Sequence, residues 1–152
     1  MINEKLFLMC RTPVFLALLS ISFSACAIDN PDVTDYVAKF EQSSQAYLQQ
    51  INKAGNNNRQ TVVAYSRYQK FLETEVKSAY KILKAKLNKS ENSSLEKSQR
   101  NWIQFRDSEF KFIDANWTRK NFGSSYVVSR GDYKCKLIKN RIMELLNYAK
   151  NY

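Results

Sequence analysis

Few residues in this chain could carry out chemistry, and their types limit what that chemistry could be. The sequence contains no histidine, so it lacks the commonest general base and the commonest metal ligand. Asp107 and Glu109 are close in sequence, but on a helix they point about 200° apart and cannot form a carboxylate pair. The three glycines, at 55, 123 and 131, are too far apart for a phosphate-binding loop. We therefore expect no enzyme activity, no cofactor and no small-molecule substrate.

The three cysteines, Cys10, Cys26 and Cys135, are expected to have separate fates. Cys10 lies in an N-terminal segment that we expect to be removed, and Cys26 is expected to be either lipidated or removed with it. One remaining thiol, Cys135, can form neither an intramolecular disulfide nor a zinc cluster. On an apolar helical face it is expected to act as a small buried hydrophobic residue, so no metal site is predicted.

The first 27 residues have the features of a secretory signal peptide. Lys5 and Arg11 precede the apolar run 14–23, which is too short to span a membrane. Cleavage after Ala27 is one possibility. The other, which we favour, is a lipoprotein whose residues 1–25 are removed and whose lipidated first residue is Cys26. Either outcome predicts a periplasmic protein, membrane-anchored in the second case, with one domain over residues 28–152.

The spacing of apolar residues in this domain predicts four helices. Asn30-Pro31-Asp32 has the features of a helix start, and Ala54-Gly55 those of a helix end. A second helix is predicted over residues 60–87 and a polar turn over 88–92. A third helix is predicted from about 94 to 117 behind a Ser93–Glu96 capping box, and a fourth after a cap at Asp132. The predicted fold class is all-α, a four-helix bundle-like single domain.

The third predicted helix is apolar around most of its circumference, so we expect other helices to surround it. Gln99, Trp102 and Arg106 share one of its faces. If this face is buried, Arg106 must be paired, and Glu109 is the local candidate. An alternative is that Trp102 and Arg106 contact a partner, because Trp and Arg are enriched at interface hot spots.

A sequence motif begins in the third predicted helix and continues into the fourth. Its residues are Gln99, Trp102, Phe105, Arg106 and Asp107, followed by Cys135, Arg141 and Leu145. The pattern resembles the LprI-type lysozyme-inhibitor family, small secreted helical proteins of bacteria, over roughly Leu72 to Ala149. The resemblance implies a protein target, lysozyme, and no catalytic residues. We interpret the motif residues as structural and expect Arg141 to approach Glu109 or Asp107.

The connection predicted between the third and fourth helices, residues 118–131, is long for a helical bundle, and such loops are often functional. It mixes aromatic, apolar and basic residues, which suits a protein-binding surface. A loop packed over the end of the bundle is the alternative. The candidate partner contacts are Trp117, Arg119, Lys120, Phe122 and Tyr126.

The formal net charge of +10 limits the kinds of partner. Export argues against nucleic acid, although basic proteins often bind it. The charge also opposes association with basic lysozymes and favours a less basic hydrolase, such as a toxin secreted by a rival bacterium. The chain is then an exported inhibitor or immunity protein that blocks an envelope-attacking hydrolase. The alternative is a structural or adaptor module that binds anionic lipid or protein through the lysine-rich side of the second helix (Lys77, Lys81, Lys84 and Lys86).

Overall fold

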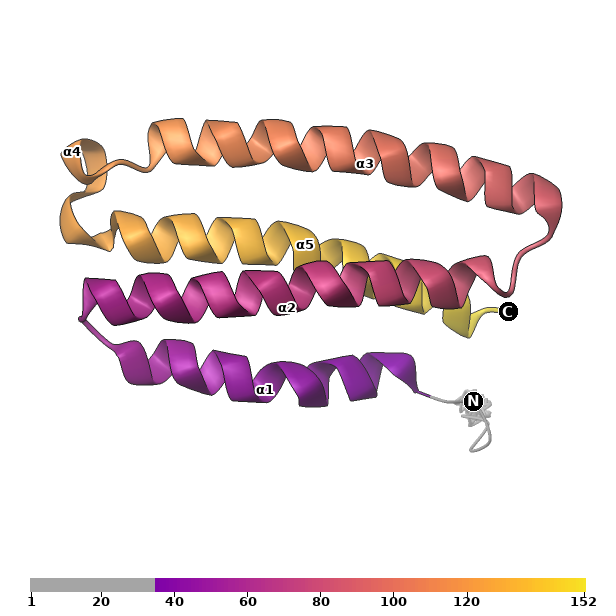
Figure 1. The fold of residues 1–152 in the computed structure, drawn as a ribbon, viewed down its shortest axis with the longest axis horizontal. Helices are drawn as coiled ribbons and strands as arrows, with labels where there is room; N and C mark the ends of the chain where they lie inside the picture. Colours follow the sequence, from indigo (N-terminus) through magenta and orange to yellow (C-terminus); the bar gives the residue numbers. More distant parts are fainter. Residues whose placement is uncertain (1–34) are drawn as a thin grey trace, which may run out of the picture. The chain divides into compact units, whose positions relative to one another are not determined.

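The computed structural model describes residues 35–152, which lie in the compact unit Pro31–Tyr152. The described chain forms the helices α1 (Tyr36–Ala54), α2 (Asn58–Lys84), α3 (Lys89–Asn116), α4 (Arg119–Phe122) and α5 (Tyr126–Lys150), with a 3-10 turn, η1 (Gly123–Ser125), before α5 (Figure 1). The described part contains no strand, so the all-α prediction is confirmed. Among the helices of residues 35–152, none combines the length and apolar composition that a membrane span requires.

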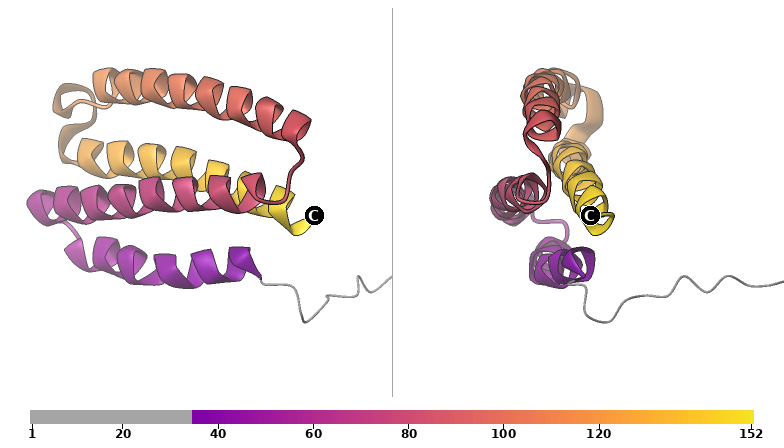
Figure 2. Two further views of the ribbon diagram at one scale, coloured as in Figure 1. Left: turned by 45° about the vertical axis from the view of Figure 1, so that its right-hand side comes forward. Right: turned by 90° about the vertical axis from the view of Figure 1, so that its right-hand side faces the viewer.

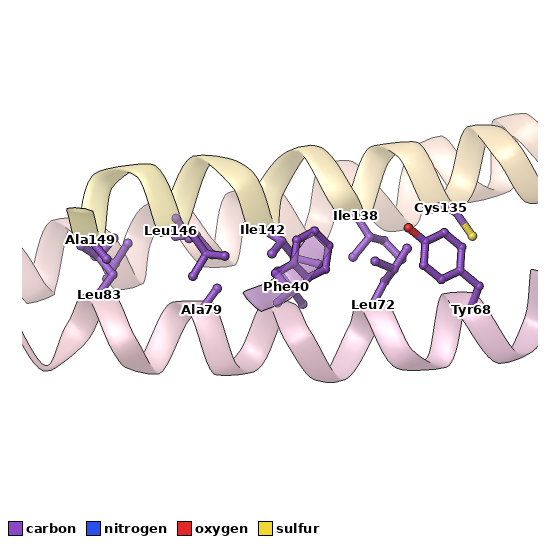
Figure 3. Packing of buried hydrophobic residues seen from close by; sticks show 13 residues of the cluster. Phe40, Tyr68, Leu72, Ala79, Leu83, Cys135, Ile138, Ile142, Leu146 and Ala149 are labelled. Carbon is purple, nitrogen blue, oxygen red and sulfur yellow. The ribbon is translucent and has the colours of Figure 1, made fainter. Parts of the chain in front are cut away.

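The hydrophobic core lies mainly between α2 and α5, which pack together along their length. Leu72, Ile138 and Ile142 are fully buried between these two helices (Figure 3). The small buried residues Ala79 and Ala149 allow the two backbones to approach closely near the end of α5.

Helix α1 covers one side of the α2–α5 pair through aromatic rings. Phe40, which is buried, and Tyr47 lie against rings of α2: the Tyr47 and Phe71 centroids are 4.4 Å apart, and those of Tyr47 and Tyr68 are 6.0 Å apart. The predicted start of this helix at Asn30-Pro31-Asp32 lies outside the described residues. The described helix begins at Tyr36, where the Asp35 carboxylate accepts the backbone N–H of Ala38.

The start of the third helix was predicted at the wrong residue. The capping box is formed by Asn88 and Glu91, whose side chains each accept the other's backbone N–H. Residues 88–92 therefore begin α3, and Ser93 and Glu96 lie inside it. The two candidate boxes have similar residue types, so the sequence pattern alone did not distinguish them.

The expected loop 118–131 is mostly helical. Thr118 caps the single turn α4, Gly123 ends it with a φ of 56°, and α5 begins at Tyr126. Asp132 therefore caps nothing and lies on the exposed side of α5. Gly131 does not end a segment either: it lies within α5, where a side chain would overlap the ring of Tyr65 on α2.

Helix α3 is not surrounded by other helices, which corrects the prediction from its apolar circumference. It packs chiefly against α5, and only Leu95 and Ile113 are buried (Figures 1 and 2). Ile103, Phe105 and Phe112 instead face solvent. The arrangement is a tight core of α1, α2 and α5 with α3 lying outside it along α5.

Candidate functional site

The family-motif residues of α3 and α5 meet around one arginine. Arg141 is only 7% exposed, and its guanidinium donates to the side-chain oxygens of Gln99, Ser98 and Glu144, each at 3.1 Å. It also lies 6.0 Å from the ring of Trp102. The expected pairing with Glu109 or Asp107 is wrong, because α3 and α5 meet in a register that brings Gln99 to Arg141.

Arg106 is the second arginine of the motif, and it stays on its own helix. Its guanidinium donates twice to Asp107, at 2.9 and 2.7 Å, instead of to Glu109 as expected. It also lies 5.5 Å from the Trp102 ring and 5.9 Å from the Phe110 ring. The Arg106 side chain is 19% exposed, so it contributes mainly by covering α3 aromatic rings.

The other motif residues divide between core and surface. Leu145 and Cys135 are buried in the α2–α5 core. Phe105, by contrast, is 51% exposed on the outer side of α3. Three motif residues, Gln99, Trp102 and Arg141, thus hold α3 against α5. Phe105 does not take part in that contact.

Basic residues of α5 also hold the far end of α3. The Lys134 ammonium bonds both carboxylate oxygens of Asp114 at 2.8 Å and lies 5.1 Å from the Phe110 ring. Arg130 donates to the backbone carbonyls of Asp114 and Trp117. The two carbonyls lie at the C-terminus of α3, where cations are favoured by the helix dipole.

Where α3, α4 and α5 meet, four aromatic rings form a cluster on the surface, which we call the aromatic cluster: Phe112, Trp117, Phe122 and Tyr133. Trp117 is its centre, with ring centroids 6.0 Å from Phe112, 5.9 Å from Phe122 and 4.6 Å from Tyr133. Phe112, Phe122 and Tyr133 are 53%, 46% and 48% exposed. Rings that pack together yet stay half-exposed are typical of a surface that binds another protein.

The sequence-predicted contact residues are only partly brought together. Trp117 and Phe122 belong to the aromatic cluster, and Arg119 and Lys120 are exposed on α4 between them. Tyr126 is partly buried, lies 5.3 Å from the Arg130 guanidinium, and lines a different cleft of about 450 Å³ between α2 and α5.

Sequence reasoning missed Phe112 and Tyr133. The sequence contained a signal for these two residues. A short connection between the third and fourth helices would make them antiparallel neighbours, so residues on either side of the connection would come close together. The assignment of residues 118–131 as a long loop concealed this pairing.

The described residues offer little chemistry beyond binding. Burial raises the pKa of the Cys135 thiol to about 12, so it stays protonated and unreactive. No group of three or more Cys, Asp or Glu side chains within residues 35–152 is placed to hold a metal ion. The α2–α5 cleft has charged walls, but Arg130 and Lys134 are already paired with Asp114. The aromatic cluster is therefore the best candidate site.

Comparison with known proteins decides the family. The family model described as "Lysozyme inhibitor LprI" matches residues 51–145, more than half of the chain. The chain belongs to the LprI family. The LprI match covers part of α1, all of α2, α3 and α4 and most of α5, including every motif residue discussed above. No match was found among curated proteins or among solved structures.

Membership in the LprI family gives the function at a coarse level. The family is one of lysozyme inhibitors, which implies a protein target. Lysozyme inhibitors act outside the cytoplasm, in the periplasm or extracellular space.

Proposed function

We propose that this protein is an exported inhibitor that blocks a cell-wall-cleaving glycoside hydrolase by docking its aromatic cluster on the enzyme. The observation that carries the proposal is the half-exposed packing of Phe112, Phe122 and Tyr133 around Trp117 in a chain of the LprI family. Aromatic residues bury large areas at little cost in conformational entropy, and Trp and Tyr dominate hot spots.

The chemistry of the target explains the neighbouring cations. Glycoside hydrolases carry two carboxyl groups on either side of the bond they cleave. Arg119 and Lys120, exposed on α4 beside the aromatic cluster, supply positive charge for such a cleft. Inhibition is then steric: the α3–α4–α5 corner fills the cleft, and the rings occupy the space of the glycan.

The net charge of +10 narrows the choice of target. Like charges slow association and weaken complexes, so a strongly basic lysozyme is a poor partner for this chain. We propose a neutral or acidic hydrolase, such as a toxin delivered by a competing bacterium, which makes the chain an immunity protein. Export through the N-terminal segment, with cleavage after Ala27 or lipidation of Cys26, brings it to the compartment where such a toxin acts.

Two matched phenylalanines test the docking surface. Phe112 and Phe105 lie one heptad apart on α3 and have nearly equal exposure, 53% and 51%, but only Phe112 packs against Trp117. We expect Phe112→Ala and Phe122→Ala each to weaken inhibition of a neutral or acidic muramidase at least about tenfold, as hot-spot residues do. Phe105→Ala should change it less than about threefold. Inhibition constants from a cell-wall lysis assay give the comparison.

Two results would count against the proposal. Equal losses for Phe105→Ala and Phe112→Ala would show that the aromatic cluster has no special part in binding. A folded protein that inhibits no muramidase, basic or acidic, would remove the proposed function itself. Circular dichroism of each variant shows whether the helices are intact.

A further inference from the structure

The outward side of α2 carries a row of cations that the proposed inhibition does not use. Arg59, Lys70, Lys77 and Lys81 are all exposed. At 100° per residue they fall within about 40° of one line along the helix, and they span roughly 33 Å at 1.5 Å per residue. We call these four residues the basic face.

The positive charge of the basic face is not neutralised by ion pairs. Within residues 35–152, none of its side chains makes an ion pair. Glu73, one turn from Lys77, instead accepts a hydrogen bond from Gln69 at 3.3 Å. Three basic residues of α5, Arg130, Lys134 and Arg141, are by contrast paired with carboxylates. Unpaired like charges in a row repel one another, so an anionic partner that offsets them would bind favourably.

The positive surface continues beyond Arg59 into the turn between α1 and α2. An open groove of about 620 Å³ there is lined by Lys53, Arg59 and Arg67, together with the amide side chains of Gln50 and Gln60. No carboxylate is among its lining residues in this part of the described chain. Val63, on the same side of α2 and 44% exposed, adds an apolar side chain between the cations.

The basic face and the aromatic cluster belong to different sides of the unit. The core side of α2 packs on α5, so the opposite side of α2, which carries most of the basic face, points away from α5 (Figure 2). Of the four cations, Lys70 alone lines the α2–α5 cleft. The aromatic cluster is built from α3, α4 and α5 and includes no residue of α2. Both surfaces can therefore be occupied at once.

We propose that the basic face docks the protein on an anionic phospholipid bilayer. A long, straight row of unpaired cations with an interspersed apolar side chain fits an extended anionic surface better than it fits a compact anion. Docking through α2 leaves the aromatic cluster directed away from the lipid, where a hydrolase can reach it. This inference stands on the basic face and the adjoining groove and does not depend on the identity of the inhibited enzyme.

A matched pair of triple variants tests the docking. Lys70→Gln, Lys77→Gln and Lys81→Gln remove three charges from the basic face, and Lys97→Gln, Lys111→Gln and Lys136→Gln remove three from exposed sites on α3 and α5. Both have the same net charge, and glutamine keeps the helix propensity of lysine. The protein to use is the unit Pro31–Tyr152, which contains the whole described core and lacks the apolar N-terminal segment.

Flotation with phosphatidylcholine vesicles, with and without phosphatidylglycerol, is the measurement. We expect binding only with phosphatidylglycerol, and release at high salt. The basic-face triple variant should bind about a hundredfold more weakly, because each basic residue near an anionic leaflet strengthens binding roughly fivefold. The control triple variant should lose less than about tenfold.

Three results would overturn the proposal. One is the absence of phosphatidylglycerol-dependent binding by the parent protein. Another is equal weakening in the two triple variants, which would assign binding to net charge alone. The third is binding of soluble polyphosphate by a protein that does not bind vesicles, which would show that the basic face binds a soluble polyanion.

Discussion

Cys135 shows how the environment of one residue changes with folding. Its thiol is buried between α2 and α5, and its sulfur lies 4.0 Å from the Tyr65 carbonyl oxygen. Desolvation, followed by the neighbouring charge of Asp132, raises its pKa from 9.0 to about 12. Burial also raises the pKa of Tyr65 and of Tyr68 above 10.0.

These shifts predict that the protein loses stability in alkali. The folded state keeps the Cys135 proton, whereas the unfolded state releases it above about pH 9, so stability is full below that pH and falls as pH rises towards 12. The free energy of unfolding should drop by up to about 1.4 kcal/mol per pH unit. Urea denaturation at a series of pH values measures it.

The variant Cys135→Ala is the control for the alkaline loss. Below about pH 9.5, where unfolded tyrosines with a pKa of 10.0 are still mostly protonated, the stability of Cys135→Ala should change much less than that of the parent. Parallel stability curves for the two proteins would show that another group controls the loss.

Residue-scale predictions from the sequence succeeded where helical spacing alone decides burial. Cys135 and Leu145 were expected on an apolar face, and both are buried. The partner of Arg141 could not be predicted, because it depends on the register between α3 and α5. That register is set by α4 and η1, which the sequence did not reveal as structured.

At the scale of elements, Gly131 explains how α5 lies so close to α2. A Cβ at this position would overlap the ring atoms of Tyr65, so the helix interior keeps a residue that normally weakens helices. The sequence pattern predicted Gly131 at the end of the loop 118–131, before a helix capped by Asp132. Gly131 instead lies inside α5, where it allows close packing against Tyr65.

Gly131→Ala therefore should destabilise the protein, although the same change stabilises an exposed helix by roughly 0.5 to 1 kcal/mol. We expect a loss of about 1 to 3 kcal/mol from overpacking, measured by urea denaturation. Tyr65→Ala in the same chain should recover part of the loss, since it removes the ring that is in the way. The control is Asn140→Ala, at an exposed position of α5. It should leave the free energy of unfolding unchanged or raise it. A similar rise for Gly131→Ala would contradict the steric explanation.

At the scale of the whole unit, stability is unevenly distributed. Helices α2 and α5 share most of the core, whereas α3 contributes Leu95 and Ile113. Side chains of α5 and the Lys84–Glu96 ion pair with α2 also hold α3 in place. The sequence predicted the number and class of the long helices correctly. It could not predict the position of α3 outside the core, because an apolar circumference fits a buried helix and a partner-binding helix equally well.

Hydrogen exchange should reveal this difference in stability between α3 and the core helices. The amides of α3 should exchange through openings of lower free energy than those of α2, because opening α3 exposes little apolar surface. The two helices have nearly equal lengths, 28 and 27 residues, so length does not explain a difference. Mass spectrometry of peptides from each helix measures it, and equal protection would show that α3 is an integral part of the core.

The shallow attachment of α3 has an evolutionary consequence. A helix that buries two of its 28 residues can accept new side chains on its outer surface with little effect on the fold. In the proposed inhibitor, α3 and α4 can therefore change along with the active-site cleft of the target enzyme, while α1, α2 and the core side of α5 stay the same. The proposed docking surface can thus evolve faster than the core.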